Sequence, residues 1–318
     1  MPQIDLSIII VNWNTKDLLL ECLSSLSNQE TIFKTEIIVV DNASTDGSAE
    51  AVIEHYQHVK VIRNDFNMGF GRAHNIGIKN SLGRYVCLLN SDALVLPNCL
   101  KNLIEFMDKN KTIGISGPKT FYPDFSLQHT CRKFPGLWNT FCGTTNLNKI
   151  FPQSDMFSDD HMVFFDHNTT RKVDGLSGCC LMIRKNALDQ IGLFDEQFFL
   201  FFEETDLCKR FRNAGWDIEF FPDASIVHHH YATASKDPVR FDIELIKSQI
   251  KYWKKHHNKI AVKTMLFISL IHHSIRLILK SILYIFTALE KRMQTTNQLL
   301  KHYYGLKLIL SGKDGRER

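Results

Sequence analysis

Residues 6–47 read LSIIIVNWNTKDLLLECLSSLSNQETIFKTEIIVVDNASTDG. The run from Leu6 to Val11 is short, rich in β-branched residues and apolar on both faces, which is typical of a strand buried in a parallel sheet. Apolar side chains then recur at helical spacing from Lys16 to Leu26, and the run from Glu36 to Val40 repeats the pattern of a buried strand. The stretch therefore predicts a β-α-β unit.

The alternation of strands and helices continues through the first hundred residues. We expect a helix over 49–56, a strand over 59–63, a helix over 71–80 and a strand over 85–89. Strands that alternate with helices at this spacing predict an α/β fold with a doubly wound, mostly parallel sheet.

Short polar residues follow three of the predicted strands, namely Asn12, Asp41 and Asp92. Because ligands of such sheets bind at the carboxyl ends of the strands, residues 1–118 are expected to form a nucleotide-binding half. The carboxylate of Asp92 could reach a diphosphate held by Mg²⁺ or Mn²⁺, and that of Asp41 could accept a hydrogen bond from a base N–H. Both side chains have a structural alternative, as caps of a helix or a turn.

The pattern becomes irregular from 121 to about 168, where Pro, Asn, Asp and aromatic residues predict loops and short strands. Regular patterns return at 174–183, in a helix through 207–211 and in a strand over 217–221. We therefore expect an acceptor-binding and catalytic half over 119–240, which completes a catalytic domain over 1–240.

Two polar clusters in this second half could carry chemistry. Three acids are crowded into Glu203-Glu204-Thr205-Asp206, where like charges in a partly apolar setting raise one another's pKa, as a general base requires. An acidic helix start favoured by the helix dipole is the alternative. His228-His229-His230 follow a strand-like run, and since neighbours on a strand face opposite sides, at most one or two of them could bind one metal ion.

The composition excludes several classes of protein. The chain of 318 residues has a formal net charge of +4 and is 44% hydrophobic, which is ordinary for a globular protein and gives no reason to expect a nucleic-acid partner. The eight cysteines include no C-x-x-C pair and predict buried, reduced thiols rather than a zinc site or disulfides. No export signal is recognised at the start of the chain, so we expect a cytoplasmic location.

Residues 241–318 differ in kind and are expected to form a basic, amphipathic helical tail. No Asp or Glu occurs between Leu245 and Leu289, whereas Lys and Arg are frequent. Within the apolar run from Met265 to Ala288, five polar residues fall on one arc of about 100°. They are Ser269, His272, His273, Arg276 and Lys280.

This geometry favours a helix that lies on an anionic membrane surface. Two alternatives are a core helix of a soluble domain and a true membrane span. A span is opposed by Arg276 and Lys280, each of which costs roughly 2.5 to 3.5 kcal/mol near the centre of a bilayer.

Seven blocks in order carry a resemblance to a known family. They are 7–14 (SIIIVNWN), 39–47 (VVDNASTDG), 67–77 (NMGFGRAHNIG), 89–92 (LNSD), 178–184 (GCCLMIR), 202–210 (FEETDLCKR) and His228. Over about residues 5–235 the chain resembles family 2 glycosyltransferases of the GT-A fold, in the bacterial rhamnosyltransferase-like branch.

The resemblance implies a nucleotide-sugar site and a metal site. The nucleotide-sugar residues would be Asn12, Asn14, Asp41, Asn42, Asn67, Asn75 and Asp92. The metal, Mg²⁺ or Mn²⁺, would be held by Asp92 and His228. The family's D-x-D motif reads Asn90-Ser91-Asp92 here, which leaves Asp92 as its main carboxylate ligand.

The resemblance also implies the reaction. Its usual Glu-Asp pair reads Glu203-Glu204, so Glu204 would be the general base of an inverting transfer, with Glu203 and Asp206 as alternatives. The implied donor is dTDP-L-rhamnose, with a UDP-sugar as the alternative. The implied acceptor is a glycan or lipid-linked glycan, reached from the cytoplasmic face of the inner membrane by a peripheral enzyme, and a homo-oligomer is compatible with the sequence.

Other functions remain to be compared with this one. A nicotinamide-binding oxidoreductase is disfavoured because the glycine-rich stretch 69–74 has His74 where a third glycine belongs, and because it does not follow the first strand. A non-catalytic nucleotide-sugar or glycan-binding relative would also explain the departures at Asn90 and Glu204. A structural protein of the membrane surface would account for the tail alone.

Overall fold

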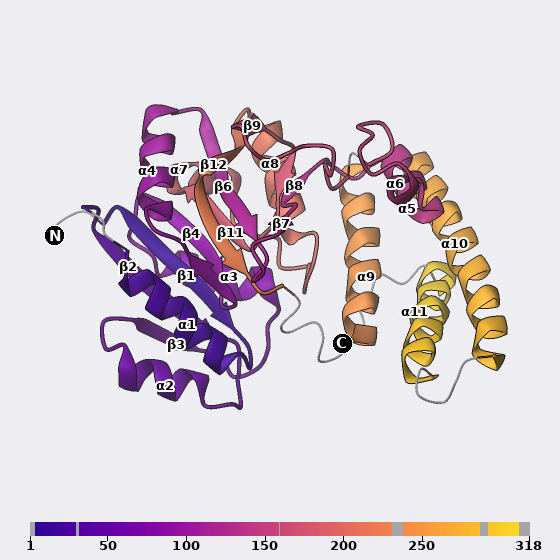
Figure 1. Cartoon of the computed structure of the whole chain (residues 1–318), viewed down its shortest axis with the longest axis horizontal. Helices are drawn as coiled ribbons and strands as arrows, with labels where there is room; N and C mark the ends of the chain where they lie inside the picture. Colours follow the sequence, from indigo (N-terminus) through magenta and orange to yellow (C-terminus); the bar gives the residue numbers. More distant parts are fainter. Residues whose placement is uncertain (1–3, 30–31, 159, 231–237, 287–291, 312–318) are drawn as a thin grey trace. The chain divides into compact units, whose positions relative to one another are not determined.

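The computed structural model describes residues 4–29, 32–158, 160–230, 238–286 and 292–311. The chain forms two compact units, shown in Figure 1. The first, which we call the sheet unit, comprises Met1–Phe134, His161–Phe199 and Glu203–Thr233. The second, the helical unit, comprises Pro135–Asp160, Leu200–Phe202 and Ala234–Arg318.

The sheet unit begins with four parallel strands, as the sequence predicts. They are β1 (Leu6–Asn12), β2 (Thr35–Asp41), β3 (Lys60–Arg63) and β4 (Tyr85–Asn90). Their order in the sheet is β3-β2-β1-β4, so the direction of the crossovers reverses between β1 and β4. Three helices connect them, namely α1 (Lys16–Ser27), α2 (Ser48–His55) and α3 (Phe70–Lys79).

The sheet continues beyond β4 with strands of both directions. In order they are β11 (Cys180–Arg184), β6 (Ile113–Phe121), β12 (Asp217–His228) and β5 (Ala93–Val95). β11 is antiparallel to β4 and β6, whereas β6 and β12 are parallel. Two short strands extend this sheet, β7 (Leu127–Gln128) beside β6 and β9 (Arg171–Lys172) beside β12. β8 (Cys131–Arg132) and β10 (Gly175–Leu176) form a separate two-stranded sheet.

This arrangement confirms the predicted α/β fold with a doubly wound, parallel-rich sheet. The sequence pattern did not identify β6 or the helix α4 (Cys99–Lys109). Two further helices, α7 (Lys185–Ile191) and α8 (Glu203–Asn213), complete the sheet unit. The irregular stretch 121–168 does contain short strands, but it also holds the helices α5 (Leu137–Thr145) and α6 (Leu147–Ile150), which the absence of a clear period concealed.

The two faces of the sheet bury separate apolar clusters because side chains alternate along a strand. In β1, Ile8 and Ile10 belong to the cluster that also contains Leu23 of α1, whereas Ile9 belongs to the cluster that contains Leu207 of α8. All eight cysteines are buried and none forms a disulfide, which confirms the expectation of buried thiols.

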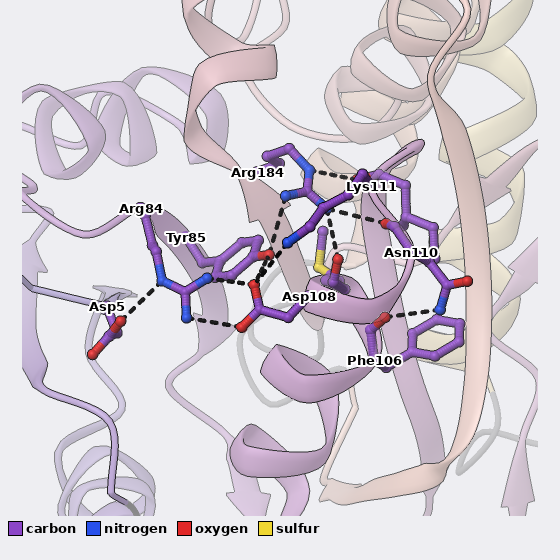
Figure 2. Close-up of polar contacts among 10 residues, drawn as sticks. Asp5, Arg84, Tyr85, Phe106, Asp108, Asn110, Lys111 and Arg184 are labelled. Carbon is purple, nitrogen blue, oxygen red and sulfur yellow. Dashed lines mark hydrogen bonds and ion pairs between the residues drawn. The ribbon is translucent and has the colours of Figure 1, made fainter.

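A polar network ties together the edge of the sheet where β1 and β4 begin (Figure 2). Arg84 donates from Nε to Asp5 at 2.9 Å and from both terminal nitrogens to Asp108, at 2.5 and 2.9 Å. Tyr85 donates to Asp108 at 3.0 Å, and Arg184 donates to Tyr85 at 3.1 Å. The network lies at the amino-terminal end of these parallel strands, whereas ligands of such sheets bind at the carboxyl end, so we assign it to stability.

The helical unit contains α5, α6, α9 (Pro238–His256), α10 (Lys259–Ile285) and α11 (Arg292–Ser311). α10 packs against α11, where Nδ1 of His273 lies 3.0 Å from Nδ1 of His302. It also packs against α5, where Nδ1 of His272 lies 2.9 Å from the carbonyl oxygen of Thr144. The predicted helical tail is therefore confirmed, although part of the unit comes from residues 135–160.

The orientation of α10 is unusual for a helix of a soluble protein. Its polar arc, which includes His273, Arg276 and Lys280, is buried or half-buried. Its apolar side chains are exposed at a spacing of three or four residues, and the exposed set includes Phe267, Ile271, Ile275, Ile278, Ile282 and Ile285. The helix is long and apolar enough to cross a membrane by length and composition, and only 11% of its most apolar window is buried, which does not fit a core helix.

Candidate active site

The carboxyl ends of β1 and β2 meet in a buried polar cluster. Asn12 pairs directly with Asp41 in the sheet, and its Nδ2 donates to Oδ1 of Asp41 at 3.3 Å and to Oγ of Ser44 at 3.1 Å. The other carboxylate oxygen of Asp41 accepts from the backbone N–H of Ser44 at 3.0 Å. These contacts place a carboxylate and an amide at the strand ends, as the sequence predicts.

The loops that follow these strands hold strained backbone. Asn14 and Ala43 have φ values of 55° and 63°, in the left-handed region that non-glycine residues seldom adopt. Oδ1 of Asn14 accepts from the backbone N–H of Thr45 at 2.7 Å, which joins the two loops. Strain of this kind costs on the order of 1–3 kcal/mol per residue and is found mostly at functional sites.

Asn42 and Asn67 organise the loop that leads into α3. Oδ1 of Asn42 accepts from the backbone N–H of Met68 at 2.9 Å, and its Nδ2 donates to Oδ1 of Asn67 at 2.9 Å. Gly69 follows with φ 85°, and a Cβ there would lie 2.2 Å from the carbonyl oxygen of Phe199. The two asparagines therefore shape the loop beside Asp41.

Asn75 lies in α3, and its side-chain amide forms hydrogen bonds to other residues of the protein. Nδ2 donates to the carbonyl oxygen of Phe194 at 2.9 Å and to Glu196 at 3.1 Å, and Oδ1 accepts from the backbone N–H of Phe194 at 3.0 Å. In this structure Asn75 ties the 194–196 segment to α3. Its predicted part in the nucleotide pocket stays a prediction.

Asp92 and His228 are brought together from opposite parts of the sequence. Asp92 follows β4 and His228 ends β12, and Oδ1 of Asp92 lies 3.2 Å from Nε2 of His228. Both side chains are largely buried. Burial opposes ionisation of Asp92, but the hydrogen bond and charge of His228 outweigh it, so the pKa of Asp92 lies below its usual value.

Further polar side chains surround the Asp92–His228 pair. Nε2 of His228 also lies 3.2 Å from Nδ2 of Asn90, and Nδ1 lies 2.8 Å from Oε1 of Gln128 in β7. Thr15 links the group to β1, since its hydroxyl donates to Oδ1 of Asn12 at 2.7 Å and lies 2.9 Å from the hydroxyl of Ser91.

The donor set suits a divalent metal. A carboxylate oxygen and an imidazole nitrogen that face one another at 3.2 Å offer one hard and one borderline ligand, a combination that Mn²⁺ accepts. Within the part of the chain that the structure describes, no group of three or more His, Cys, Asp or Glu side chains could hold a metal ion. A metal at Asp92 and His228 would therefore need further ligands from substrate or water.

The acids of α8 have distinct surroundings. Asp206 is fully buried and pairs with Nε of Arg210 at 2.9 Å, which gives it a structural role. Burial raises the pKa of Glu203 well above its usual value, the charge of Glu204 adds to this, and Oε2 of Glu203 has no hydrogen-bond partner. Burial also raises the pKa of Glu204. Hydrogen bonds from backbone N–H groups and the positive charge of Arg132 lower this pKa, but by less than burial raises it.

Sequence reasoning missed Gln128, Thr15 and Arg132. Gln128 and Arg132 lie in the stretch where the sequence shows no regular period, and polar residues there give no signal that separates a loop from a site. Thr15 directly follows the Trp13-Asn14 pair, so its closeness to Asn12 could have been noticed.

The sequence profile described as "Glycosyl transferase family 2" matches residues 7–192. The chain belongs to this family. This glycosyltransferase is 28% identical over 245 residues to the N-acetylglucosaminyl-diphospho-decaprenol L-rhamnosyltransferase of Mycobacterium tuberculosis, a match that covers 73% of this chain and 78% of the relative. It is 26% identical over 237 residues to the rhamnosyltransferase WbbL of Escherichia coli K12, covering 70% of this chain and 83% of the relative.

Solved structures confirm the fold of this glycosyltransferase as GT-A. The mannosyltransferase PcManGT of Pyrobaculum calidifontis, in complex with GDP-Man and Mn²⁺, matches with a TM-score of 0.58 and 16% identity, covering 98% of this chain and 88% of the other. S. aureus TarS 1-349 matches with a TM-score of 0.53 and 14% identity, covering 98% and 92%. The resemblance to family 2 glycosyltransferases of the GT-A fold is thereby confirmed, and the two relatives named above are both rhamnosyltransferases.

Proposed function

We propose that this glycosyltransferase is an inverting, metal-dependent hexosyltransferase that moves a sugar from a nucleotide donor to the hydroxyl of a glycan acceptor. The observation that carries the proposal is the 3.2 Å approach of Asp92 Oδ1 and His228 Nε2 beside the carboxyl end of β4. It lies next to the point where the strand order reverses, which is where open α/β sheets bind nucleotides.

The nucleotide would bind over the ends of β1 and β2. Asp41 keeps a carboxylate at this edge that can accept hydrogen bonds from a base or ribose, and Asn12 holds it in place. Asn14, Asn42 and Asn67 shape the loops around it. In this arrangement the diphosphate reaches toward Asp92.

Asp92 and His228 would hold Mn²⁺ or Mg²⁺. When bound, such an ion neutralises negative charge that develops on the departing nucleoside diphosphate. The lowered pKa of Asp92 keeps its carboxylate ionised and ready to act as a ligand at neutral pH.

Glu204 is proposed as the general base. Its raised pKa makes it a better proton acceptor than an exposed glutamate, and the ion pair of Asp206 with Arg210 supports Glu204 over Asp206 in this role. Glu204 would take the proton from the acceptor hydroxyl while the oxygen attacks the anomeric carbon from the face opposite the leaving diphosphate. A single displacement of this kind inverts the anomeric configuration.

For the donor we propose dTDP-L-rhamnose, on the strength of the two rhamnosyltransferases described above. A UDP-sugar would fit the same strand ends. A non-catalytic relative that only binds nucleotide sugars or glycans is the second candidate, favoured by Asn90 in place of the first acid of the D-x-D motif.

The helical unit is proposed to hold the enzyme at the cytoplasmic face of the inner membrane as a peripheral protein. α10 exposes a row of isoleucines while it buries its polar arc, and no acid occurs between Leu245 and Leu289. An apolar face in a positively charged segment suits an anionic lipid surface. α5, which packs beside α10, adds the exposed rings of Trp138 and Phe141. A lipid-linked glycan acceptor agrees with this placement.

Calorimetry of donor binding tests the proposal. We expect one nucleotide sugar among dTDP-rhamnose, UDP-galactose, UDP-N-acetylglucosamine and GDP-mannose to bind in the presence of Mn²⁺, and binding to be lost with a chelator or in Asp92→Ala. Binding of none of the four to wild type would count against the donor site at the ends of β1 and β2. If one donor binds, transfer of its sugar to a soluble acceptor separates an enzyme from a non-catalytic binding protein.

A further inference from the structure

Gln128 contacts the imidazole of His228 on the side away from Asp92. Gln128 ends β7 and His228 ends β12, so the contact joins residues 100 positions apart in the sequence. Oε1 of Gln128 lies 2.8 Å from Nδ1 of His228, and both side chains are largely buried. Because a carbonyl oxygen only accepts hydrogen bonds, this contact requires a proton on Nδ1.

The proton on Nδ1 decides what Nε2 can do. A neutral imidazole protonated at Nδ1 presents a lone pair at Nε2. In this structure Nε2 lies 3.2 Å from Oδ1 of Asp92, which accepts a hydrogen bond from it, so a cation would take the place of the proton between these two atoms. With a cation bound, the Asp92 carboxylate and the Nε2 lone pair would face the same ion while Nδ1 keeps its hydrogen bond to Gln128.

A purely structural role explains Gln128 poorly. Its Nε2 is buried without a hydrogen-bond partner, and leaving a buried donor unsatisfied costs roughly 1–3 kcal/mol. A leucine of similar size would avoid that cost while filling the same space. What only the amide provides is the acceptor oxygen for Nδ1 of His228.

We propose that Gln128 is a positioning residue that holds the imidazole of His228 at Nδ1, directs Nε2 toward Asp92 and thereby sets the affinity of the Asp92–His228 pair for a divalent cation. This inference rests on the proposed function in one respect, namely that the pair binds a metal. Partners that orient a metal-binding histidine typically contribute 10- to 100-fold to metal affinity. Gln128 acts through its contact with His228.

Three variants of the full chain test the proposal. Gln128→Leu removes the acceptor oxygen, whereas Gln128→Glu keeps one. Gln190→Leu makes the same chemical change in α7, where Oε1 of Gln190 accepts from Trp216 instead. Mn²⁺ binding is measured by electron paramagnetic resonance with Mn²⁺ alone and with Mn²⁺ plus dTDP or UDP.

We expect Gln128→Leu to weaken Mn²⁺ binding about 10- to 100-fold. Gln128→Glu should restore most of the affinity, and Gln190→Leu should match wild type. Unchanged Mn²⁺ affinity in Gln128→Leu would overturn the inference while leaving the proposed function intact. If wild-type protein bound no Mn²⁺ under any of these conditions, the inference and the proposed metal dependence would fall together, and donor calorimetry would decide the rest.

Discussion

Asp92 and His228 approach within 3.2 Å, although one follows the fourth strand of the chain and the other ends the twelfth. Nδ2 of Asn90 lies 3.2 Å from Nε2 of His228, at the position that the resemblance assigns to the first acid of a D-x-D motif. The site therefore has one negative charge fewer than a D-x-D site would have, and this difference can be tested by restoring the acid.

Asn90→Asp should tighten Mn²⁺ binding in the presence of the donor nucleotide. A second carboxylate near the pair adds a ligand for a hard cation, and we expect a gain of about tenfold, which corresponds to about 1.4 kcal/mol. The measurement is an Mn²⁺ titration at constant dTDP or UDP, with Asn80→Asp at the end of α3 as a control. Weaker binding in Asn90→Asp would show that the hydrogen bond from Asn90 to His228 matters more than the added charge.

Glu204→Gln should abolish transfer without loss of donor binding. Removal of a general base typically lowers kcat by about 10²- to 10⁴-fold, and the amide has nearly the shape of the acid. Because burial raises the pKa of Glu204, the base is protonated and inactive at low pH, so wild-type kcat should rise with pH and reach a plateau above that pKa. Full turnover by Glu204→Gln would exclude it as the base.

Glu203→Gln should make the protein more stable at neutral pH. The pKa of Glu203 is raised in the folded state, so its contribution to stability is full below the unfolded pKa and declines as pH rises through the folded value. The amide cannot ionise, so the variant should exceed wild type in urea midpoint at pH 7 to 8 and approach it near pH 4. Glu54→Gln, at an exposed position in α2, is the control and should show no such dependence.

Arg84→Met should destabilise the sheet unit by roughly 1–2 kcal/mol at pH 7, because it removes a two-pronged, partly buried ion pair and the bond to Asp5. The Arg84 guanidinium lowers the pKa of Asp108 to about 2, so the stability from this pair is present above the unfolded pKa near 4 and is lost as pH falls toward 2. Arg63→Met, which breaks the exposed pair with Glu50, should change stability by less than about 0.5 kcal/mol. Equal effects of the two substitutions on the urea midpoint would contradict this ranking.

Charges on the exposed face of α10 should release the protein from anionic vesicles. We expect Ile275→Glu with Ile278→Glu to abolish sedimentation with vesicles of phosphatidylglycerol and phosphatidylethanolamine, whereas donor binding in solution stays unchanged. Lys263→Glu should weaken sedimentation less and make it more sensitive to salt. Sedimentation of the double variant at wild-type levels would exclude this face as the lipid contact.

The spacing of apolar residues along the chain predicted much of the fold, because this spacing depends on local secondary structure. The alternation from Leu6 to Leu89 located β1 to β4 and α1 to α3 within one or two residues, since buried strands and amphipathic helices each leave a period in the chain. The same method missed α4 and β6, and it missed α5 and α6 in a stretch without a clear period. It also predicted that five polar residues of α10 lie on one arc, but it did not predict the direction in which that arc faces.

The sequence by itself determined that this chain is a family 2 glycosyltransferase with an α/β sheet, because seven short blocks in a fixed order and the strand-helix alternation are both properties of the chain read in one dimension. The tertiary structure decided that Gln128 and Asp92 both contact His228. It also decided that Asp206 forms an ion pair with Arg210 and that Asn75 binds the 194–196 segment. The physical reason is that β11, β6 and β12 join the sheet out of sequence order. Packing over the whole sheet fixes which strand ends become neighbours. The local spacing of apolar residues along the chain carries no information about this.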